Sequence, residues 1–338
     1  MEFISEYGLF LIKLVSVVIV ILIILMAISS LLGKVKGKIR GKLEVHKLND
    51  KYENYKHIIV RESKTKQELK ALKKLLKREK KQDKKKEPSG NIFVLNFHGD
   101  IKASAVTALR EEITAILTAA DAKKDEVFVR LESGGGLVNA YGLAASQLQR
   151  IKDAKIKLVI AIDKIAASGG YMMACVADHI IAAPFAVVGS IGVVSQLPNF
   201  HRYLQQKAID FEQITAGDYK RTLNLFAENT PTGREKMQEE VNDTHELFKH
   251  FIQENRQHVE MPRVATGEHW FAKQAHQAEL HLVDELKTSD DYLLAASKKY
   301  NLYEIEYKLK KRFGQRMASN AANIYHKLLS NGTQTRAF

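Results

Sequence analysis

One stretch sets the course of the chain: Asp163-Lys-Ile-Ala-Ala-Ser168-Gly-Gly-Tyr-Met-Met-Ala-Cys175. The residues before it, 157–162, form a short apolar run rich in β-branched side chains, which is typical of a buried strand. Those at 171–177 are small and apolar, as expected of a buried helix. Ala-Ala-Ser-Gly-Gly therefore lies on a sharp turn between a strand and a helix.

Ser168 at this turn has two interpretations. A helix N-terminus offers unsatisfied N–H groups and a positive dipole end, so a serine hydroxyl there can attack a carbonyl while the Gly169 amide stabilises the oxyanion. Alternatively, Ser168 only caps the helix and the glycines only allow close packing. Because Ser-Gly-Gly is a weak motif, the turn alone favours the cap.

Strand and helix patterns alternate on both sides of this turn. Strands are predicted at 92–97, 126–132 and 157–162, and helices at 103–120, 143–151 and 171–177. This alternation predicts an α/β domain with a largely parallel sheet.

The run from Ile180 to Leu197 is apolar enough to resemble a membrane span. Pro184, Gly189 and Gly192 interrupt it, so we predict two buried strands instead. Further along, a short helix is predicted at 200–207, a strand at 211–215 and a long helix at 232–257.

The N-terminal region carries a run of 19 uncharged, almost wholly apolar residues, Leu14–Leu32, about the span of a bilayer core. Basic residues follow it between Lys34 and Lys42, whereas a signal peptide has its charge in front. We therefore expect an uncleaved transmembrane helix. The positive-inside rule places the N-terminus outside and the rest of the chain in the cytoplasm.

A lysine-rich segment connects this anchor to the α/β domain. Residues 61–87 hold thirteen Lys and Arg against five Asp and Glu, a large part of the net charge of +13. Such a block is a solvated stalk or contacts anionic lipid. Nucleic-acid binding is disfavoured because aromatic interleaving and a recognisable module are both missing.

The composition shifts divide the chain into four parts. These are the anchor (1–33), a basic linker or helical stalk (34–90), the α/β domain (91–300) and a basic tail (301–338), with Pro88-Ser-Gly90 at the domain boundary. The single cysteine, Cys175, cannot form an intramolecular disulfide and is expected to be a small buried hydrophobe.

Gly134-Gly135-Gly136 follows a predicted strand, so its amides can face a ligand without interference from side chains. A nucleotide-binding loop is disfavoured because Gly-Lys-Ser/Thr does not follow. Next to Ser168, the glycines fit better as the second wall of an oxyanion hole. Ser168 also needs a base. The histidines show no spacing that selects one of them, and a lysine such as Lys220 would have to be neutral to serve.

Four motifs together resemble the signal peptide peptidase A family in order and spacing. They are Ser133-Gly-Gly-Gly136, Ala166-Ala-Ser-Gly-Gly-Tyr171, Gly189-Ser-Ile-Gly192 and Gly217-Asp-Tyr-Lys220. The resemblance runs from the anchor to Asp284. It implies a ClpP/crotonase-like fold and cleavage of peptides by a Ser/Lys dyad.

The resemblance also implies a role for each site residue. Ser168 is the nucleophile, Lys220 the general base, and Ser190 the serine that holds the lysine. Three glycine amides correspond to the oxyanion hole: Gly135, Gly136 and Gly169. Neither a cofactor nor a metal is expected. The family forms ring- or dome-like homo-oligomers whose neighbouring subunits complete the groove, and the implied location is the bacterial inner (plasma) membrane.

This chain departs from the family pattern at two positions. Gly134 stands where the family usually has proline in Ser-Pro-Gly-Gly, which frees the loop and weakens its preorganisation. His281 stands where the family usually has glycine in Gly-Leu-Val-Asp, which puts the turn there in question.

The expected function is a membrane-anchored serine endopeptidase that acts on membrane-derived, signal-peptide-like or unfolded peptides. One alternative is a catalytically silent oligomeric scaffold in the membrane. Another is an acyl-CoA enzyme of the crotonase fold, which needs an oxyanion hole but not this Ser/Lys pair. Fold alone does not separate these possibilities, so the decision depends on the dyad.

Overall fold

The computed structural model describes residues 13–17, 41–65, 67–69, 88–277 and 279–309. The chain divides into two compact units, one of residues 43–307 and the other of residues 1–42 with 308–338. Within the described ranges, no helix has both the length and the apolar character needed to cross a membrane. The predicted anchor, Leu14–Leu32, lies outside these ranges apart from a helical turn at 13–17.

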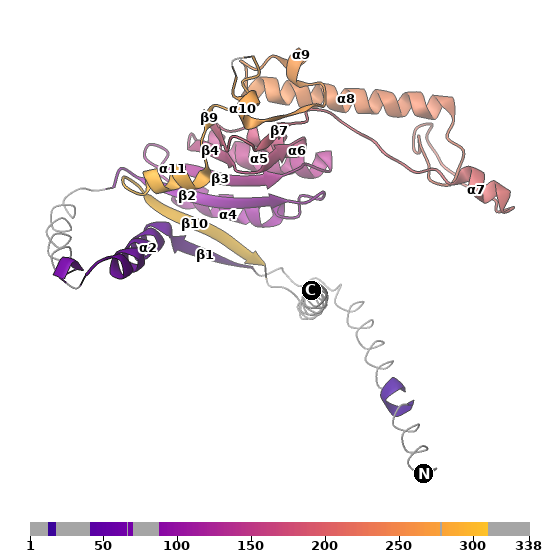
Figure 1. Ribbon diagram of the computed structural model, residues 1–338. Coiled ribbons are helices and arrows are strands. Elements are labelled where there is room, and N and C mark those ends of the chain that lie inside the picture. Colours follow the sequence, from indigo (N-terminus) through magenta and orange to yellow (C-terminus); the bar gives the residue numbers. More distant parts are fainter. Residues whose placement is uncertain (1–12, 18–40, 66, 70–87, 278, 310–338) are drawn as a thin grey trace, which may run out of the picture. The chain divides into compact units, whose positions relative to one another are not determined.

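A mostly parallel sheet of ten strands forms the centre of the larger unit (Figure 1). Its main path runs β1-β10-β2-β3-β4-β6-β9. In that order the strands are Gly41–Lys47, Asn301–Leu309, Asn91–Gly99, Glu126–Ser133, Lys157–Ile162, His179–Ala182 and Glu285–Leu286. The predicted α/β class and parallel sheet are confirmed.

A short branch leaves the main sheet and leads to Ser168. It consists of β5 (Ile165–Ala167), β7 (Val187–Gly189) and β8 (His269–Phe271). β5 pairs in parallel with β3 and β7, and β7 pairs antiparallel with β8. The branch therefore brings the end of β3, the end of β5 and the end of β7 together.

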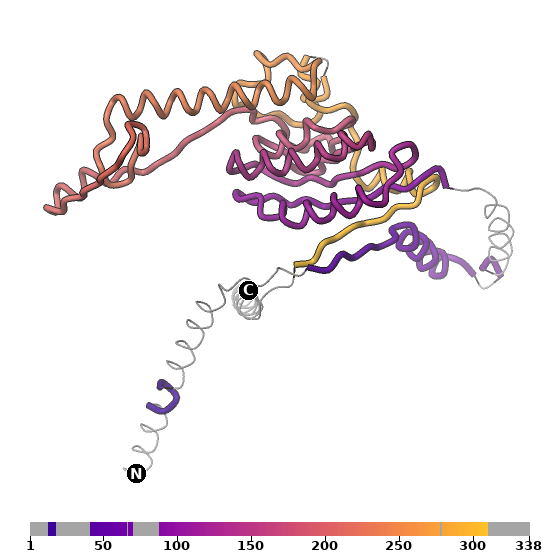
Figure 2. Tube along the Cα trace, turned by 180° about the vertical axis from the view of Figure 1, so that it is seen from behind, coloured from indigo at the N-terminus to yellow at the C-terminus, as the bar shows by residue number. Residues whose placement is uncertain are grey.

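Helices cover both faces of the sheet, as the two views show (Figures 1 and 2). α4 (Val106–Ala119), α5 (Val138–Asp153) and α6 (Gly169–Ala174) share the larger core, and α2 (Leu48–Ser63) and α11 (Ser289–Ala296) join the smaller one. Along β3, Val127 and Val129 face the larger core and Phe128 faces the smaller one. A strand buried on both faces explains the continuous apolar run in its sequence.

The remaining helices follow β7. They are α7 (His201–Gln206), α8 (Pro231–Asn255), α9 (Met261–Val264) and α10 (Ala272–Ala275). α8 begins with a proline, and the Thr230 hydroxyl caps it by accepting from the Gly233 amide at 3.1 Å. Of its residues, only Phe248 and Ile252 are buried. The C-terminal half of α8 is thus its docked half.

Two sequence predictions in this region had different outcomes. The two buried strands predicted in place of a membrane span are present as β6 and β7. The strand predicted at 211–215 is wrong, since this segment forms no strand. Ile214 is 96% exposed there, so its apolar pattern has no core to face.

The structure also places helices and strands in two segments that the sequence analysis assigned to the basic linker and the basic tail. Residues 41–63, within the predicted linker, form β1 and α2. Residues 301–309, the start of the predicted basic tail, form β10, which pairs in parallel with β2. Leu302 and Ile305 are buried in β10 on opposite faces of the sheet, so the segment shows no one-sided alternation that would have predicted a strand.

Candidate active site

Ser168 lies between β5 and α6 in a backbone conformation that serine rarely adopts. Its φ of 53° and ψ of −121° fall outside the regions that side chains favour. Its amide donates to the Gly189 carbonyl at 2.8 Å, and its carbonyl accepts from the Met172 amide at 3.0 Å. The side chain makes no capping hydrogen bond. Without that bond, the simple N-cap interpretation loses its physical basis.

The glycine loop packs directly against this turn. Gly135 has a φ of 88°, and a Cβ there would lie 2.7 Å from the Gly169 nitrogen and 2.8 Å from Ser168 Cβ. A Cβ on Gly136 would lie 2.2 Å from the Ile101 carbonyl oxygen. Both positions therefore require glycine, because any side chain would push the loop away from Ser168.

The three glycine amides predicted for the oxyanion hole differ in what they bind. The Gly135 amide donates to Ser133 Oγ at 3.0 Å. Within the described residues, the amides of Gly136 and Gly169 have no acceptor. These two are therefore the donors that remain available to a bound carbonyl.

Ser168 opens into a small pocket of about 20 Å³. The pocket is lined by Gly136, Val138, Ser168, Gly169, Met172, Gly192, Val193, Thr244 and Phe248. A groove of about 420 Å³ shares Val138, Val193 and Thr244 with it and continues along α8 past Met237, Glu240 and Val241. An extended chain lying in this groove would pass beside the pocket that Ser168 lines.

Ser190 lies next to Ser168 because β7 joins them. The Gly189 carbonyl accepts the Ser168 amide, and Ser190 is the following residue. Ser190 has a φ of 52°, and its own amide donates to the Glu268 carbonyl at 2.6 Å. The structure thus places the backbone of Ser190 one residue from the carbonyl that accepts the Ser168 amide.

Lys220 lies elsewhere in the chain. It is exposed, and its amide donates to the Gly217 carbonyl at 3.1 Å. The neighbouring Tyr219 ring lies 5.3 Å from Lys236 Nζ, near the start of α8. Thr244 lines the Ser168 pocket and comes eight residues after Lys236 on α8, which corresponds to about 12 Å of helix. The described contacts do not bring Lys220 to either serine.

The segment that carries Lys220 is held together by its own contacts. We call residues 199–227 the arm. The Phe200 amide donates to the Leu225 carbonyl at 2.7 Å, and the Phe200 and Phe211 rings lie 6.2 and 5.6 Å from the Phe226 ring. In Figure 1 the arm, with α7, lies by the N-terminal end of α8, away from the sheet.

The histidines weighed as possible bases lie away from Ser168. The lining of its pocket contains none of them. His179 contacts Asp284 at 3.8 Å and Glu285 at 3.3 Å, and His98 contacts Glu132 at 3.6 Å. Both rings thus face carboxylates that lie outside the lining of the Ser168 pocket.

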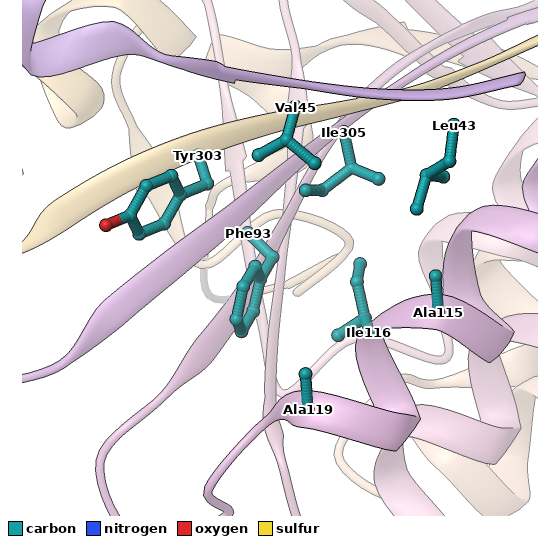
Figure 3. Close-up of a pocket in the computed structure, with 8 residues that line it drawn as sticks. All are labelled: Leu43, Val45, Phe93, Ala115, Ile116, Ala119, Tyr303 and Ile305. Atoms are coloured by element: carbon teal, nitrogen blue, oxygen red, sulfur yellow. The ribbon is translucent and has the colours of Figure 1, made fainter.

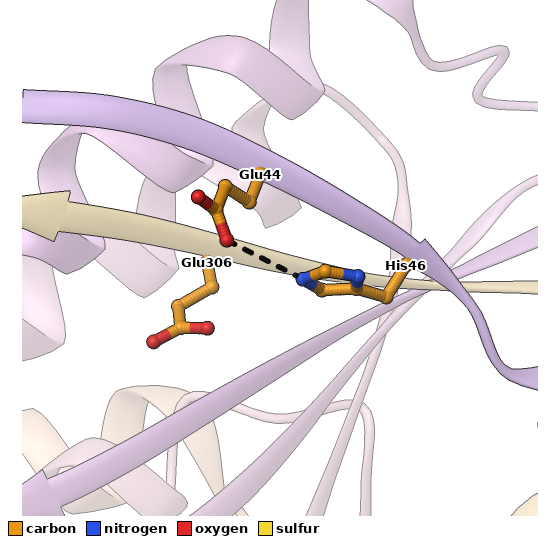
Figure 4. Close-up of side chains that lie close together, drawn as sticks. All are labelled: Glu44, His46 and Glu306. Carbon is orange, nitrogen blue, oxygen red and sulfur yellow. Dashed lines mark ion pairs between the residues drawn. The ribbon is translucent and has the colours of Figure 1, made fainter.

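Two other features of the described residues are separate from Ser168. A groove of about 290 Å³ lies between α4 and the strands β1, β2 and β10, and its lining is almost wholly apolar (Figure 3). On β1 and β10, ligand atoms of Glu44, His46 and Glu306 lie within 4.8 Å of one another, the spacing a metal ion would need (Figure 4). Neither feature includes a residue of the Ser168 pocket.

Comparison with known proteins identifies relatives of the chain. Residues 2–148 match the family description "Peptidase family S49 N-terminal", and residues 150–303 match "Peptidase family S49". The chain is 52% identical to "Probable protease SohB" of Haemophilus influenzae over 258 residues, which cover 75% of this chain and 71% of the relative. It is 42% identical to "Putative protease SohB" of Buchnera aphidicola subsp. Baizongia pistaciae, over 98% of this chain and 99% of the relative.

Solved structures show a weaker likeness. One is a lysine-to-alanine mutant of the 1510-N membrane-bound stomatin-specific protease in complex with a substrate peptide. It aligns with 70% of this chain and 99% of its own at a TM-score of 0.41 and 13% identity.

Proposed function

The chain belongs to peptidase family S49 and is a serine-type peptidase, and from this premise we propose that it cleaves peptide bonds with Ser168 as nucleophile and Lys220 as general base. The proposal includes the ClpP/crotonase-like fold implied by the family resemblance. Its main support is the state of Ser168: its hydroxyl makes no capping hydrogen bond, it lies in a strained turn, and it shares a pocket with Gly136 and Gly169, whose amides have no acceptor among the described residues.

The chemistry uses these groups in sequence. Neutral Lys220 Nζ takes the proton of Ser168 Oγ while Oγ bonds to the substrate carbonyl carbon. The carbonyl electrons move to its oxygen, which the Gly136 and Gly169 amides stabilise. The C–N bond then breaks, and the lysine returns its proton to the leaving amine. Water, deprotonated by Lys220, attacks the resulting ester, and the lysine returns that proton to Ser168 Oγ as the acyl–oxygen bond breaks. Ser190 orients the lysine by a hydrogen bond.

The position of Lys220 supports assembly into a homo-oligomer. Because one chain holds Lys220 far along α8 from its own Ser168, the lysine that serves a given Ser168 comes from a neighbouring copy. The arm also carries several exposed large apolar side chains that a neighbour would cover: Phe200, Tyr203, Ile209, Phe211, Ile214 and Tyr219. Repeated contacts of this kind between identical subunits close into a ring or dome.

The groove beside α8 supports an extended peptide as substrate. Most of its lining side chains are apolar, with Glu240 as its charged member. Within the described residues, the backbone groups of 192–199 have no backbone partner, so a peptide could pair with them as an added strand. Unfolded, membrane-derived or signal-peptide-like segments have the required extended, apolar character.

Membrane attachment belongs to the same proposal. The apolar run Leu14–Leu32 would anchor the protein in the bacterial inner membrane, and the basic residues after it would contact anionic lipid. By the charge rule, the N-terminus faces outward and the peptidase domain faces the cytoplasm.

The decisive experiment is covalent labelling of the full chain with a fluorophosphonate, followed by mass spectrometry. We expect the label on Ser168, and we expect Ser168→Ala and Lys220→Ala each to lose hydrolysis of a fluorogenic peptide while remaining folded. A silent scaffold would take up no label, and an acyl-CoA enzyme would turn over a thioester but not the peptide. Hydrolysis retained in Ser168→Ala would refute the proposal.

A further inference from the structure

We propose that Tyr141 is a positioning residue of this active site, which sets the spacing between the glycine loop and the Ser168 turn. The inference rests on the proposed function, because it concerns how the Gly136 and Gly169 amides are aligned. Tyr141 lies on α5, and its side chain is fully buried. Neither the sequence motifs nor the family resemblance includes it.

The Tyr141 hydroxyl holds one wall of the site through a chain of hydrogen bonds. It donates to the Asp100 carbonyl at 2.8 Å and lies 2.5 Å from Ser133 Oγ. A phenol has one proton, so the shorter contact is donated by Ser133. Ser133 Oγ in turn accepts the Gly135 amide at 3.0 Å. The chain therefore runs in one direction, from the Gly135 amide through Ser133 and Tyr141 to Asp100.

The Tyr141 ring packs against the Ser168 turn, on the other side of the site. A Cβ on Gly169 would lie 2.5 Å from Tyr141 Cγ, so the ring packs on the backbone that carries the Gly169 amide. A single rigid side chain thus contacts the Ser168 turn with its ring and the glycine loop with its hydroxyl. Burial raises the pKa of Tyr141, which keeps the phenol protonated and able to donate.

The segment at the Asp100 end of this hydrogen-bond chain also contacts the glycine loop. Next to Asp100, the Ile101 carbonyl accepts the Leu137 amide at 2.9 Å and faces Gly136 closely. The loop is therefore fixed at Gly135 and at Leu137, on either side of Gly136. Because the Gly135 amide is bound internally, the Gly136 amide is left to face the substrate.

Alignment of this kind affects the rate more than it affects substrate binding. Oxyanion donors act in the transition state, and displacing one of them by less than 1 Å weakens it where charge develops. A purely structural tyrosine would instead change stability without a specific effect on kcat. The ratio of the effects on kcat and KM separates the two roles.

The test compares two buried tyrosines in the full chain. Tyr141→Phe keeps the ring and removes the hydroxyl. We expect kcat for a fluorogenic peptide to fall about 10- to 100-fold, with KM within about twofold of wild type. The matched control is Tyr171→Phe, which is equally buried and loses a hydrogen bond from its hydroxyl to the Leu282 carbonyl (3.1 Å). Its kcat should remain within about twofold of wild type.

A second variant tests the hydrogen-bond chain itself. Ser133→Ala removes the link between Gly135 and Tyr141, and we expect a similar fall in kcat. The double variant should be scarcely slower than either single variant, because both break the same chain. If Tyr141→Phe does not fold, Ser133→Ala decides the question alone.

Failure of this inference is distinguishable from failure of the proposed function. If Ser168→Ala retains hydrolysis, the proposed function fails first, and the Tyr141 inference fails with it. If Ser168→Ala is inactive but Tyr141→Phe or Ser133→Ala keeps the wild-type kcat, only the Tyr141 inference is overturned. A rise in KM at unchanged kcat would overturn it as well.

Discussion

Ser168 and Ser190 both have a positive φ, which most side chains avoid, with values of 53° and 52°. Such a conformation costs on the order of 1–3 kcal/mol and persists only where neighbouring groups hold it. Here the Ser168 amide is held by the Gly189 carbonyl and the Ser190 amide by the Glu268 carbonyl. Both backbones are thus held by hydrogen bonds to the short branch, one to β7 and one to the residue before β8.

The strain at Ser168 predicts that glycine is better tolerated there than alanine. Ser168→Gly and Ser168→Ala both remove the proposed nucleophile, so both should be inactive. They differ only in Cβ, which is unfavourable at a positive φ. We expect the glycine variant to be more stable by about 0.5–1 kcal/mol, after allowance for its more flexible unfolded state. Urea unfolding of the full chain measures the difference, and an alanine variant of equal or greater stability would show that the turn is unstrained.

His281 is a second residue whose backbone explains a family preference. It has a φ of 52°, and its carbonyl accepts a hydrogen bond from Arg256 Nη2 at 3.1 Å. Glycine, which the family usually has there, adopts this conformation without strain. The chain keeps the turn with histidine because Arg256 holds the carbonyl and also forms a two-pronged pair with Asp284, at 2.6 and 2.8 Å.

At the level of elements, α4 and β10 are joined by a buried carboxyl group. Glu112 of α4 accepts the Tyr307 amide of β10 at 2.8 Å. Burial raises the pKa of Glu112 to about 7, the Tyr307 hydrogen bond opposes this rise, and Glu306 adds to it. The folded state therefore binds a proton more tightly at Glu112 than the unfolded state does.

The pH dependence follows from the sign of this shift. Because the pKa is raised on folding, the stability it contributes is complete below the unfolded pKa of about 4.5 and is lost as the pH rises through about 7. Glu112→Gln keeps an acceptor for Tyr307 but cannot ionise. We expect it to be more stable than wild type by about 2 kcal/mol at pH 8, with a much smaller difference at pH 5.

Urea unfolding at both pH values makes the measurement, and Glu111→Gln, at the exposed neighbouring position, is the matched control. The control should be indistinguishable from wild type at either pH. An equal effect of the Glu112 and Glu111 substitutions, or an effect of Glu112→Gln that does not grow with pH, would contradict the assignment.

The sequence predicted the elements that have a clear period and missed those that do not. The alternation that gives β2, β3 and β4 with α4 and α5 was visible because each runs for several residues with a regular pattern. β5 and β8 have three residues each, too few to show a period. The apolar residues at 211–215 were mistaken for a strand because they pack within the arm or face solvent, not a sheet.

The same distinction holds for the candidate site. Ser168, Ser190 and the glycines were predicted because motifs carry them, and the structure places Ser168 against Gly135, Gly136 and Gly169. Tyr141 and Ser133 were missed as a linked pair, since a tyrosine on a helix and a serine at a strand end normally signal core packing and a turn. Lys220 was predicted from its motif alone. No local sequence pattern predicts that Lys220 lies away from the Ser168 of the same chain.

At the level of the whole molecule, the arm determines what one chain can do alone. Tyr219 contacts the start of α8, whereas the Ser168 pocket is lined by Thr244 and Phe248 near its docked end. Since α8 is a continuous helix, it would act as a spacer between the proposed base and the proposed nucleophile. A spacer of this kind suits an assembly in which each arm reaches the next subunit, and it would prevent hydrolysis by an isolated chain.

Mixing two inactive variants tests this assembly. Ser168→Ala retains the lysine and Lys220→Ala retains the serine, so a site that takes one group from each of two copies is restored in mixed oligomers. With random equal mixing, about one quarter of the interfaces pair an intact serine with an intact lysine, so we expect about one quarter of wild-type activity. Co-expression of the two full-length variants, followed by peptide hydrolysis on the purified mixture, makes the measurement. The control replaces Ser168→Ala by the double variant Ser168→Ala/Lys220→Ala, which supplies no lysine and should restore nothing. If the two single variants also restore nothing although both are found in the same oligomers, Lys220 serves the Ser168 of its own chain, and the arm must then fold back along α8 to reach it.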